Sequence, residues 1–386
     1  MKRRFRAGRV ETQQAGMEGY GAFIPAPLPP DPPISLDGEL QSLLDAASRA
    51  LGRLDGISLL LPDPRLFLSM YIRKEAVLSS QIEGTQSSLS DLLLFENDEL
   101  TTVDLDDVRE VSNYTAAMRH GLDRLRGGFP LSLRLLREIH GILMQNARGG
   151  DKTPGEFRRS QNWIGGSRPG NARFVPPPPH ALMASLDDLE KFLHAQTSMS
   201  LLVKAGLAHA QFETIHPFLD GNGRVGRLLI TFLLCAEGAL TQPLLYLSLY
   251  LKEHRDEYYE SLQRIRTDGE WEEWLRFYLR GVESVARQAT STARTIVQLF
   301  EEDRQKLHAI GRGASSALRV HDLLKERPIL SIAATVRTLG LTKPTVASAM
   351  ENLENLGIVR EESGRRRDRL FVYRQYLNVL NEGGQR

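Results

Sequence analysis

Residues 216–227 read HPFLDGNGRVGR and combine side chains and glycines that suit the binding of a polyphosphate. Gly221 and Gly223 permit close approach of the backbone to an anion, and the apolar run from Val225 to about Glu237 predicts a helix that begins at the same place. Free N–H groups and the positive end of a helix both attract phosphate. This stretch therefore predicts a phosphate-binding turn at a helix N-terminus.

The polar side chains of this stretch favour the same chemistry. Arg224 and Arg227 lie three positions apart, so both guanidinium groups can reach one polyphosphate from the same helix face. Asp220 offers the hard oxygen ligand that Mg²⁺ prefers, and Asn222 can donate a hydrogen bond to a phosphate oxygen. His216 can take a proton near neutral pH, so it is the candidate general base for a hydroxyl that attacks phosphorus.

Each of these residues also has an ordinary structural role open to it. His216 and Pro217 can cap a core helix, and the arginines can form surface ion pairs. A polyphosphate site explains all twelve positions in their order, whereas the structural alternative must explain each one separately. Residues 216–227 are therefore interpreted as a catalytic site.

The same stretch resembles the signature of the Fic family of protein AMP transferases, which reads His-Pro-Phe, any residue, Asp or Glu, Gly-Asn-Gly-Arg, any two residues, Arg. Every fixed position is matched between His216 and Arg227. The resemblance implies a mainly α fold: a Fic-type helical bundle with a small β-hairpin flap, plus a C-terminal winged-helix domain. It also implies transfer of AMP from ATP to a Ser, Thr or Tyr hydroxyl of a target protein.

The resemblance assigns a role to each part of the signature. His216 would deprotonate the target hydroxyl, Asp220 would hold Mg²⁺ between the α- and β-phosphates, and residues 221–223 would cradle the α-phosphate. Arg224 and Arg227 would bind the β- and γ-phosphates. ATP is thus the expected co-substrate and Mg²⁺ the expected cofactor. The ATP-binding residues expected in this stretch are Gly221, Asn222, Gly223, Arg224, Val225, Gly226 and Arg227.

Two further segments resemble the parts of Fic proteins that border the nucleotide and the target. Residues 161–166, with Gly165 and Gly166 beside the nucleotide, match the flap on which a target protein docks by β-strand addition. Tyr258 and Tyr259 match tyrosines beside the adenine. An ordinary surface hairpin and simple helix packing are the alternatives for these two segments.

Glu83 lies near the end of a predicted helix that begins at about residue 64, where a carboxylate opposes the helix dipole. It is therefore either solvated or paired with a cation from elsewhere in the fold. Ser79, Glu83 and Gly84 match the inhibitory helix of Fic proteins, which implies that Glu83 pairs with Arg227 and blocks the γ-phosphate. In some Fic proteins this glutamate also positions a water that removes AMP, and the sequence leaves both roles open.

Apolar residues at three-to-four spacing predict that the chain is mainly helical. The proline-rich residues 25–33 should run extended over the surface. Residues 148–179 are rich in glycine and proline, so they should form a loop or a small hairpin. The predicted helical stretches of the first 300 residues include 40–51, 66–77, 108–125, 131–144, 182–192 and 201–212.

A polar segment that ends at Gly313 precedes a second helical pattern. Helices over residues 318–325, 331–338 and 345–356, followed by a hairpin, are typical of a winged helix-turn-helix. Arginines at the wing tip could reach nucleic-acid phosphates, but winged helices also bind proteins or form dimers, so DNA, a protein partner and a homodimer all stay open. The wing-tip arginines are Arg365, Arg366, Arg367 and Arg369.

Composition places few limits on the function. The chain has 386 residues, enough for two or three domains, and its 49 basic and 48 acidic residues give no overall charge from which to predict nucleic-acid binding. A single cysteine, Cys235, excludes an internal disulfide and fits a reducing compartment. No apolar run approaches the ~20 residues of a membrane span, so a cytoplasmic protein without membrane contact is expected.

The expected domains are an N-terminal region at 1–100 with an inhibitory helix at about 64–84, a Fic core at 101–300 and a winged helix at 313–386.

Two other functions stay open at this stage. The core could sense a nucleotide within a DNA-binding regulator, although the intact His216 favours catalysis. Some Fic proteins transfer UMP, phosphocholine or phosphate, and residues 221–223 with the two arginines favour a nucleoside triphosphate without specifying adenine.

Overall fold

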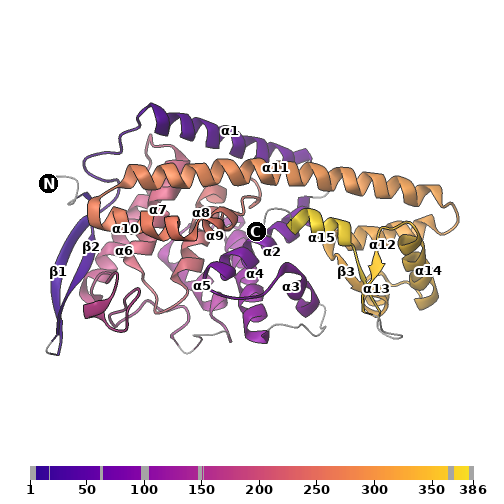
Figure 1. Cartoon of the computed structure of the whole chain (residues 1–386), viewed down its shortest axis with the longest axis horizontal. Coiled ribbons are helices and arrows are strands. Elements are labelled where there is room, and N and C mark those ends of the chain that lie inside the picture. Colours follow the sequence, from indigo (N-terminus) through magenta and orange to yellow (C-terminus); the bar gives the residue numbers. More distant parts are fainter. Residues whose placement is uncertain are drawn as a thin grey trace.

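The computed structural model describes residues 6–16, 18–60, 64–96, 104–146, 150, 152–363 and 369–381. This part of the chain is mainly helical, with two small antiparallel sheets, and it forms an elongated molecule (Figure 1). The predicted class of fold, mainly α-helical, is confirmed.

An N-terminal hairpin is the element that the sequence analysis did not anticipate. Strands β1 (Gly8–Ala15) and β2 (Glu18–Pro25) pair antiparallel over their full length. Phe23 of β2 is buried, and its N–H donates to the Val175 carbonyl at 2.9 Å. The hairpin is therefore fixed to the body beside the predicted flap. Residues 26–33 contain no helix or strand, as the prolines predicted.

The phosphate-binding turn connects two helices in the core of the molecule. Helices α7 (Leu201–Ile215) and α8 (Asn222–Ala236) are buried on nearly every side, because apolar residues occupy most of their positions. Other helices surround this pair: α2, α4 and α5 contact α8, while α6 and α10 contact α7. Their bounds, with those of two short helices, are α2 (Pro64–Ile82), α3 (Leu89–Glu96), α4 (Leu105–Arg126), α5 (Leu133–Leu143), α6 (Pro179–His194), α9 (Ser248–Glu253) and α10 (Arg255–Asp268).

Helix α11 (Trp271–Ala309) runs along most of the length of the molecule, and α1 (Gly38–Leu60) packs against it (Figure 1). The predicted helices before residue 301 overlap with helices of the structure. The polar residues 301–309, however, belong to α11 and are not part of a linker. The expected boundary near residue 312 falls in the turn after this helix.

The C-terminal elements follow the order predicted for a winged helix. In the described part of this region, four helices accompany a three-stranded sheet in which β5 lies between β3 and β4. Ser331 and Thr342 cap α13 and α14 with their hydroxyl groups. The elements are α12 (Ala314–Glu326), β3 (Ile329–Ser331), α13 (Ile332–Leu339), α14 (Lys343–Asn355), β4 (Arg360–Glu361), β5 (Leu370–Val372) and α15 (Arg374–Asn381). Of the wing-tip arginines, residues 365–367 lie outside the described residues, so binding of DNA or of a protein there stays a prediction.

Cys235 on α8 is half-buried, and burial raises the pKa of its thiol to about 12. A thiol that stays protonated is a poor nucleophile, which favours a structural role for this cysteine. Within the described ranges, no helix has the length and apolar character needed to cross a membrane.

Candidate functional site

The turn between α7 and α8 is shaped by its own backbone and by one amide side chain. His216 ends α7 in the left-handed conformation, with φ of 50°, and Gly221 has φ of 73°. Asn222 bridges the turn, because its Oδ1 accepts from the Phe218 N–H and its Nδ2 donates to the Phe218 carbonyl, each at 2.8 Å. The Asn222 amide oxygen and one of its two N–H groups are thus used within the turn, and donation of the second N–H to a phosphate stays a prediction.

Three side chains from outside the signature hold this turn in place. Arg158 Nε donates to the His216 carbonyl at 2.9 Å, and Asn162 Nδ2 donates to the Phe218 carbonyl at 2.9 Å. His140 stacks on the Phe218 ring, with the ring centroids 3.8 Å apart. This role could not be predicted from the sequence for any of the three, because the contacts join segments that are distant in the sequence.

His140 is a neutral bridge between two backbone groups. Its Nδ1 accepts from the Gly155 N–H at 2.8 Å, so the proton is on Nε2, which donates to the Asp220 carbonyl at 3.1 Å. Burial lowers the pKa of His140 to about 4, which keeps the ring neutral near pH 7. The sequence signal for this role is a histidine at a core-facing position of α5, near Leu136 and Leu143.

The turn and α4 border a polar cavity of about 300 Å³. Arg224 Nη1 lies 3.1 Å from Glu110 Oε2, and both side chains are buried. Asp220 is half-exposed, and its carboxylate pairs with Lys152 Nζ at 2.8 Å. Burial raises the pKa of Asp220, but the bonds from Lys152 and the Gly221 N–H outweigh it and lower the pKa overall. Asp220 is therefore an anion at neutral pH.

The end of α2 fixes Arg227. Its Nε donates to Ser79 Oγ at 2.8 Å, and its Nη2 donates to the Ser79 carbonyl at 2.9 Å and to Glu83 Oε1 at 2.6 Å. Burial opposes ionisation of Glu83, but Arg227 lowers the pKa of this carboxyl below its usual value. A Cβ on Gly223 would lie 2.2 Å from Glu83 Oε1, so the carboxylate lies directly over the predicted phosphate cradle. Gly84, with φ of 106°, turns the chain away after this contact.

His216 lines a second cavity of about 960 Å³. Its Nδ1 lies 3.9 Å from Glu213 Oε2 and has no hydrogen-bond partner among the described residues. Burial, with the charges of Arg266 and Arg158, lowers the pKa of His216 to about 4. His216 is therefore neutral near pH 7, which is the protonation state that a general base requires.

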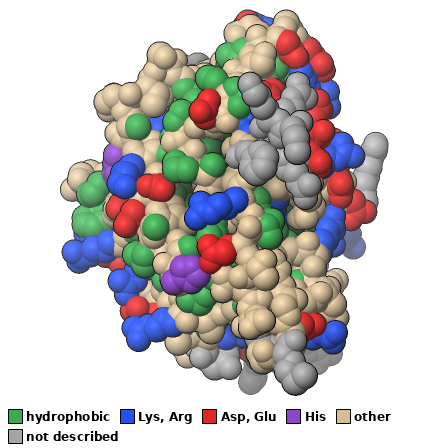
Figure 2. Space-filling view, turned by 90° about the vertical axis from the view of Figure 1, so that its left-hand side faces the viewer, with side chains coloured by type: hydrophobic (Ala, Val, Ile, Leu, Met, Phe, Trp, Pro, Cys, Tyr) green, Lys and Arg blue, Asp and Glu red, His purple; other side chains and the backbone are tan. Residues whose placement is uncertain are grey.

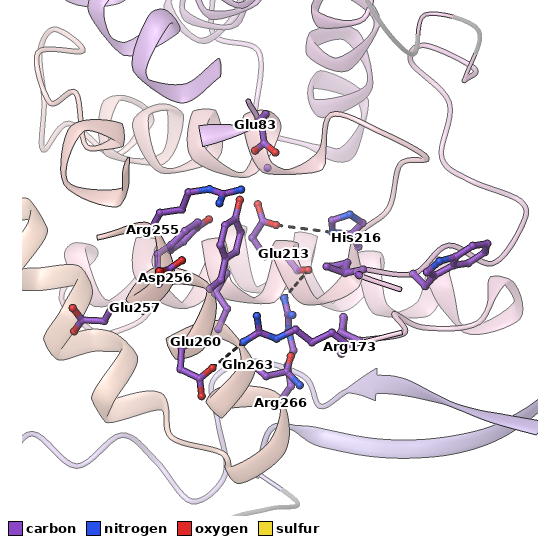
Figure 3. Close-up of a pocket in the computed structure, with 18 of the residues that line it drawn as sticks. Glu83, Arg173, Glu213, His216, Arg255, Asp256, Glu257, Glu260, Gln263 and Arg266 are labelled. Carbon is purple, nitrogen blue, oxygen red and sulfur yellow. Dashed lines mark hydrogen bonds and ion pairs between the residues drawn. The ribbon is translucent and has the colours of Figure 1, made fainter. Parts of the chain in front are cut away.

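Glu83 stands at the junction of the two cavities. Figure 3 shows Glu83 and Arg266 on opposite sides of the larger cavity, with Glu213 and His216 between them. Glu83, His216 and Gly223 line both cavities. A polyphosphate that extends from one cavity into the other would therefore meet the Glu83 carboxylate.

The two predicted adenine-binding tyrosines line the larger cavity in different ways. Tyr258 is fully buried, and its hydroxyl is bonded to His209 Nε2 at 2.9 Å. Tyr259 is only partly buried, so its ring is accessible to a ligand. Of the two flap glycines, Gly165 lines the cavity, whereas Gly166 lies next to it in the chain and contacts Asn171 instead.

The flap is a short antiparallel pair. Ile164 and Phe174 exchange two backbone hydrogen bonds, of 2.8 and 3.1 Å, and residues 165–173 connect them. Trp163 is 38% exposed at the edge of the larger cavity. The predicted small hairpin over the helical body is thus present, and docking of a target protein on residues 161–166 stays a prediction.

Two regions of the chain match known families. Residues 41–123 match the Fic/DOC family N-terminal region, and residues 130–234 match the Fic/DOC family. The second range includes the flap, both helices of the core pair and the complete turn. The chain carries Fic N-terminal and Fic domains. The first matched region includes the end of α2 with Ser79 and Glu83.

Relatives of this Fic protein have adenylyltransferase names. Protein adenylyltransferase Fic of Culex quinquefasciatus is 33% identical over 177 residues, and Probable protein adenylyltransferase aq_aa38 of Aquifex aeolicus is 28% identical over 187 residues. These matches cover 45% and 48% of this chain, but 32% and 54% of the relatives. The chain thus spans between about a third and about half of the length of these relatives.

Solved structures show the same fold. A Fic family protein from Desulfovibrio desulfuricans G20 is 21% identical, with a TM-score of 0.59 over 88% of this chain and 97% of that chain. Fic-1 from C. elegans is also 21% identical, with a TM-score of 0.50 over 67% of this chain and 72% of that chain.

The Fic turn of this chain can accommodate the expected Mg²⁺. No cluster of three His, Cys, Asp or Glu side chains that could hold a metal occurs in the described part of the chain. Mg²⁺ in phosphate-transfer sites usually takes only one or two carboxylates, and phosphate oxygens and waters complete its coordination. Asp220 is anionic, half-exposed and part of the smaller cavity, so it fits a Mg²⁺ that arrives with the nucleotide, provided that Lys152 releases the carboxylate.

Proposed function

We propose that this Fic protein transfers AMP from ATP to a side-chain hydroxyl of a target protein and that Glu83 inhibits the transfer. The observation that carries this proposal is the position of the Glu83 carboxylate, which lies over Gly223 and is paired with Arg227. Both are positions at which the Fic signature binds phosphates. Relatives that are named protein adenylyltransferases support AMP as the group transferred.

In the proposed reaction, the hydroxyl oxygen of Ser, Thr or Tyr bonds to the α-phosphorus, and the bond from this phosphorus to pyrophosphate breaks. Neutral His216 accepts the hydroxyl proton, and pyrophosphate leaves with the electron pair of the broken bond. The N–H groups at the start of α8 stabilise the charge on the α-phosphate, and Arg224 and Arg227 bind the other phosphates. Mg²⁺ at Asp220 would neutralise charge on the α- and β-phosphates.

The proposed inhibition follows from charge and space. While Glu83 pairs with Arg227, this arginine is not available to a γ-phosphate, and the carboxylate would repel an anion at the cradle. ATP would then bind with its α-phosphate out of line with the hydroxyl near His216. Movement of the end of α2 away from the turn would release both restraints.

Removal of AMP from a modified target is a second activity that the same residue could support. Glu83 lines the larger cavity together with His216, so its carboxylate could orient a water for attack on the α-phosphorus. Incubation of AMP-labelled target with wild-type protein tests this: release of labelled AMP that Glu83→Gln abolishes would support the activity.

The main experiment uses ATP labelled at the α-phosphate, Mg²⁺, and three proteins: wild type, Glu83→Gly, and Glu83→Gly combined with His216→Ala. Label should appear strongly on protein with Glu83→Gly and weakly with wild type. His216→Ala in the Glu83→Gly background should lose on the order of 10²-fold or more of the activity. ATP labelled at the γ-phosphate serves as the control, because AMP transfer leaves that label in pyrophosphate.

The outcomes separate the alternatives. Label from the γ-phosphate on protein would mean that the enzyme transfers phosphate. Label from UTP but not from ATP would mean that UTP is the nucleotide donor. No protein label from any donor with Glu83→Gly would contradict the transferase proposal. Equal label with wild type and Glu83→Gly would contradict the inhibition alone.

A further inference from the structure

A groove next to the larger cavity is used by neither the nucleotide nor the catalytic residues. It has a volume of about 520 Å³ and lies between the β1–β2 hairpin, the residues after the flap, and α10. Figure 3 shows strands of the hairpin passing beside Arg266 and Gln263 of α10. Tyr20 and Gly21 of β2 line the groove, so the hairpin forms one of its sides.

The groove is continuous with the cavity that contains His216. Four side chains line both of them: Arg173, Phe174, Gln263 and Arg266. A peptide whose hydroxyl reached His216 could therefore continue past Arg173 into the groove without leaving the surface. The flap strand that ends at Phe174 forms the border between the two spaces.

The lining of the groove is basic. Arg9, Arg173 and Arg266 contribute to it, whereas none of the described residues that line it is Asp or Glu. Arg9 is exposed, and Arg173 pairs with the exposed Glu260 at 2.8 Å, so an incoming carboxylate can reach both. Arg266 is buried and bonded to the Glu213 carbonyl and Thr214, so it adds charge but is not free to turn outward.

The rest of the groove suits an extended chain with apolar side chains. Val10 is 64% exposed on β1, and Tyr20 and Pro169 offer further apolar surface. Figure 2 faces the end of the molecule that carries the hairpin, and there acidic, basic and hydrophobic side chains are interspersed. The positive charge is therefore a property of the groove and not of the whole face.

We propose that this groove binds an extended, acidic segment of the protein that is modified, with Arg9 and Arg173 binding its carboxylates. This proposal rests on the proposed function, because it names the target chemistry of the same active site. The hairpin then selects targets, and the flap aligns the hydroxyl. Carboxylates in a target segment would form ion pairs on entry, whereas lysines there would be repelled.

The test uses synthetic peptides that contain one Ser, Thr or Tyr, flanked on either side by Glu or by Lys. AMP transfer is measured with the Glu83→Gly protein and with the same protein carrying Arg9→Glu. Arg294→Glu is the matched control, because Arg294 is exposed on α11, away from the groove, and the change in net charge is the same. Direct binding of each peptide to wild-type protein and to each of these variants is measured by fluorescence anisotropy.

The Glu-flanked peptides should bind and react better than the Lys-flanked ones, and Arg9→Glu should reduce this ratio roughly fivefold, as expected for one exposed ion pair. Arg294→Glu should leave the ratio unchanged. Equal binding of both peptide sets, or a ratio that Arg9→Glu does not alter, would overturn the groove proposal. If Arg9→Glu weakens binding of the Glu-flanked peptides but no protein transfers AMP, the groove stands and the proposed reaction fails.

Discussion

The Glu213 carboxylate lies 3.9 Å from the Nδ1 atom of His216, within a single turn at the end of α7. A Cβ on Gly226 would lie 2.4 Å from Glu213 Oε1, so the absence of a side chain at Gly226 leaves room for this carboxylate. Burial raises the pKa of Glu213 to about 7, although Arg227 opposes the shift. The state of Glu213 therefore changes in the pH range in which the enzyme would work.

Glu213→Gln should change how AMP transfer depends on pH. Ionised Glu213 stabilises the imidazolium that forms when His216 accepts a proton, and it is ionised only above pH about 7. In the Glu83→Gly protein, the rate should rise from pH 6 to pH 8, roughly threefold to tenfold, corresponding to about half to one pKa unit of interaction. Glu213→Gln should remove this rise. The same rise in both proteins would assign it to the phosphates of ATP instead.

At the scale of residues, a contact could be predicted from the sequence where both partners belong to known motifs. These motifs predicted that Glu83 would meet Arg227, and the structure contains this ion pair. They did not indicate Glu110, which pairs with Arg224 across 114 residues of sequence. No local pattern encodes such a pair. The sequence signal that Glu110 needs a cationic partner was its place on the buried face of α4, beside Val108 and Val111.

Helix α2 carries an ionisable group in its buried middle, besides the residues at its end that contact Arg227. Glu75 is fully buried and accepts hydrogen bonds from Ser248 on α9 and from the Tyr114 hydroxyl on α4. Burial raises its pKa to about 7, although the bonds from Ser248 oppose the shift. The charge of Glu75, and with it the stability of the packing of α2 against α4 and α9, therefore depends on pH near 7.

The sign of the pH effect follows from this shift. The folded-state pKa exceeds the ordinary value of 4.5, so protonated Glu75 contributes stability at low pH that is lost as pH rises through 7. Relative to Glu75→Gln, wild-type protein should lose roughly 2–3 kcal/mol between pH 5 and pH 8. Urea denaturation of both proteins at several pH values measures this difference. A constant difference would mean that Glu75 has the same pKa in the folded and unfolded states.

At the scale of elements, helices with a clear apolar period were predictable and the hairpin was not. Helices α4 to α7 overlap with the predicted stretches, because the three-to-four spacing extends over several turns. In β2 only residues 22–25 are buried. The alternation of apolar and polar residues that indicates a strand is therefore too short to recognise in the sequence. The position of the hairpin beside the flap depends on contacts with Val175, which the local sequence does not contain.

The whole molecule is held together by α11. This helix contacts α1, α7 and α10 in the Fic core, and its far end contacts α12 and α15. Helix α12 also contacts α2, so the C-terminal elements touch the helix whose end pairs with Arg227. Figure 1 shows α12 to α15 at one end of the molecule, beyond the core.

A buried hydrogen bond joins the C-terminal elements to α11. The Tyr373 hydroxyl, fully buried, donates to Asp303 Oδ2, and Lys306 Nζ pairs with the other carboxylate oxygen at 2.7 Å. Removal of the hydroxyl would leave Asp303 with one unsatisfied buried oxygen. The cost of such a group is typically about 1–3 kcal/mol.

Tyr373→Phe should therefore weaken the attachment of the C-terminal elements by about 1–3 kcal/mol. Hydrogen exchange should become faster in α12 and α15 but stay unchanged in α7 and α8, because the core keeps its contacts. Tyr278→Phe is the control: Tyr278 is equally buried in α11, but its hydroxyl has no hydrogen-bond partner among the described residues, so its loss should cost nothing. Faster exchange throughout the molecule with Tyr373→Phe would instead mean that the core and the C-terminal elements unfold as one cooperative unit.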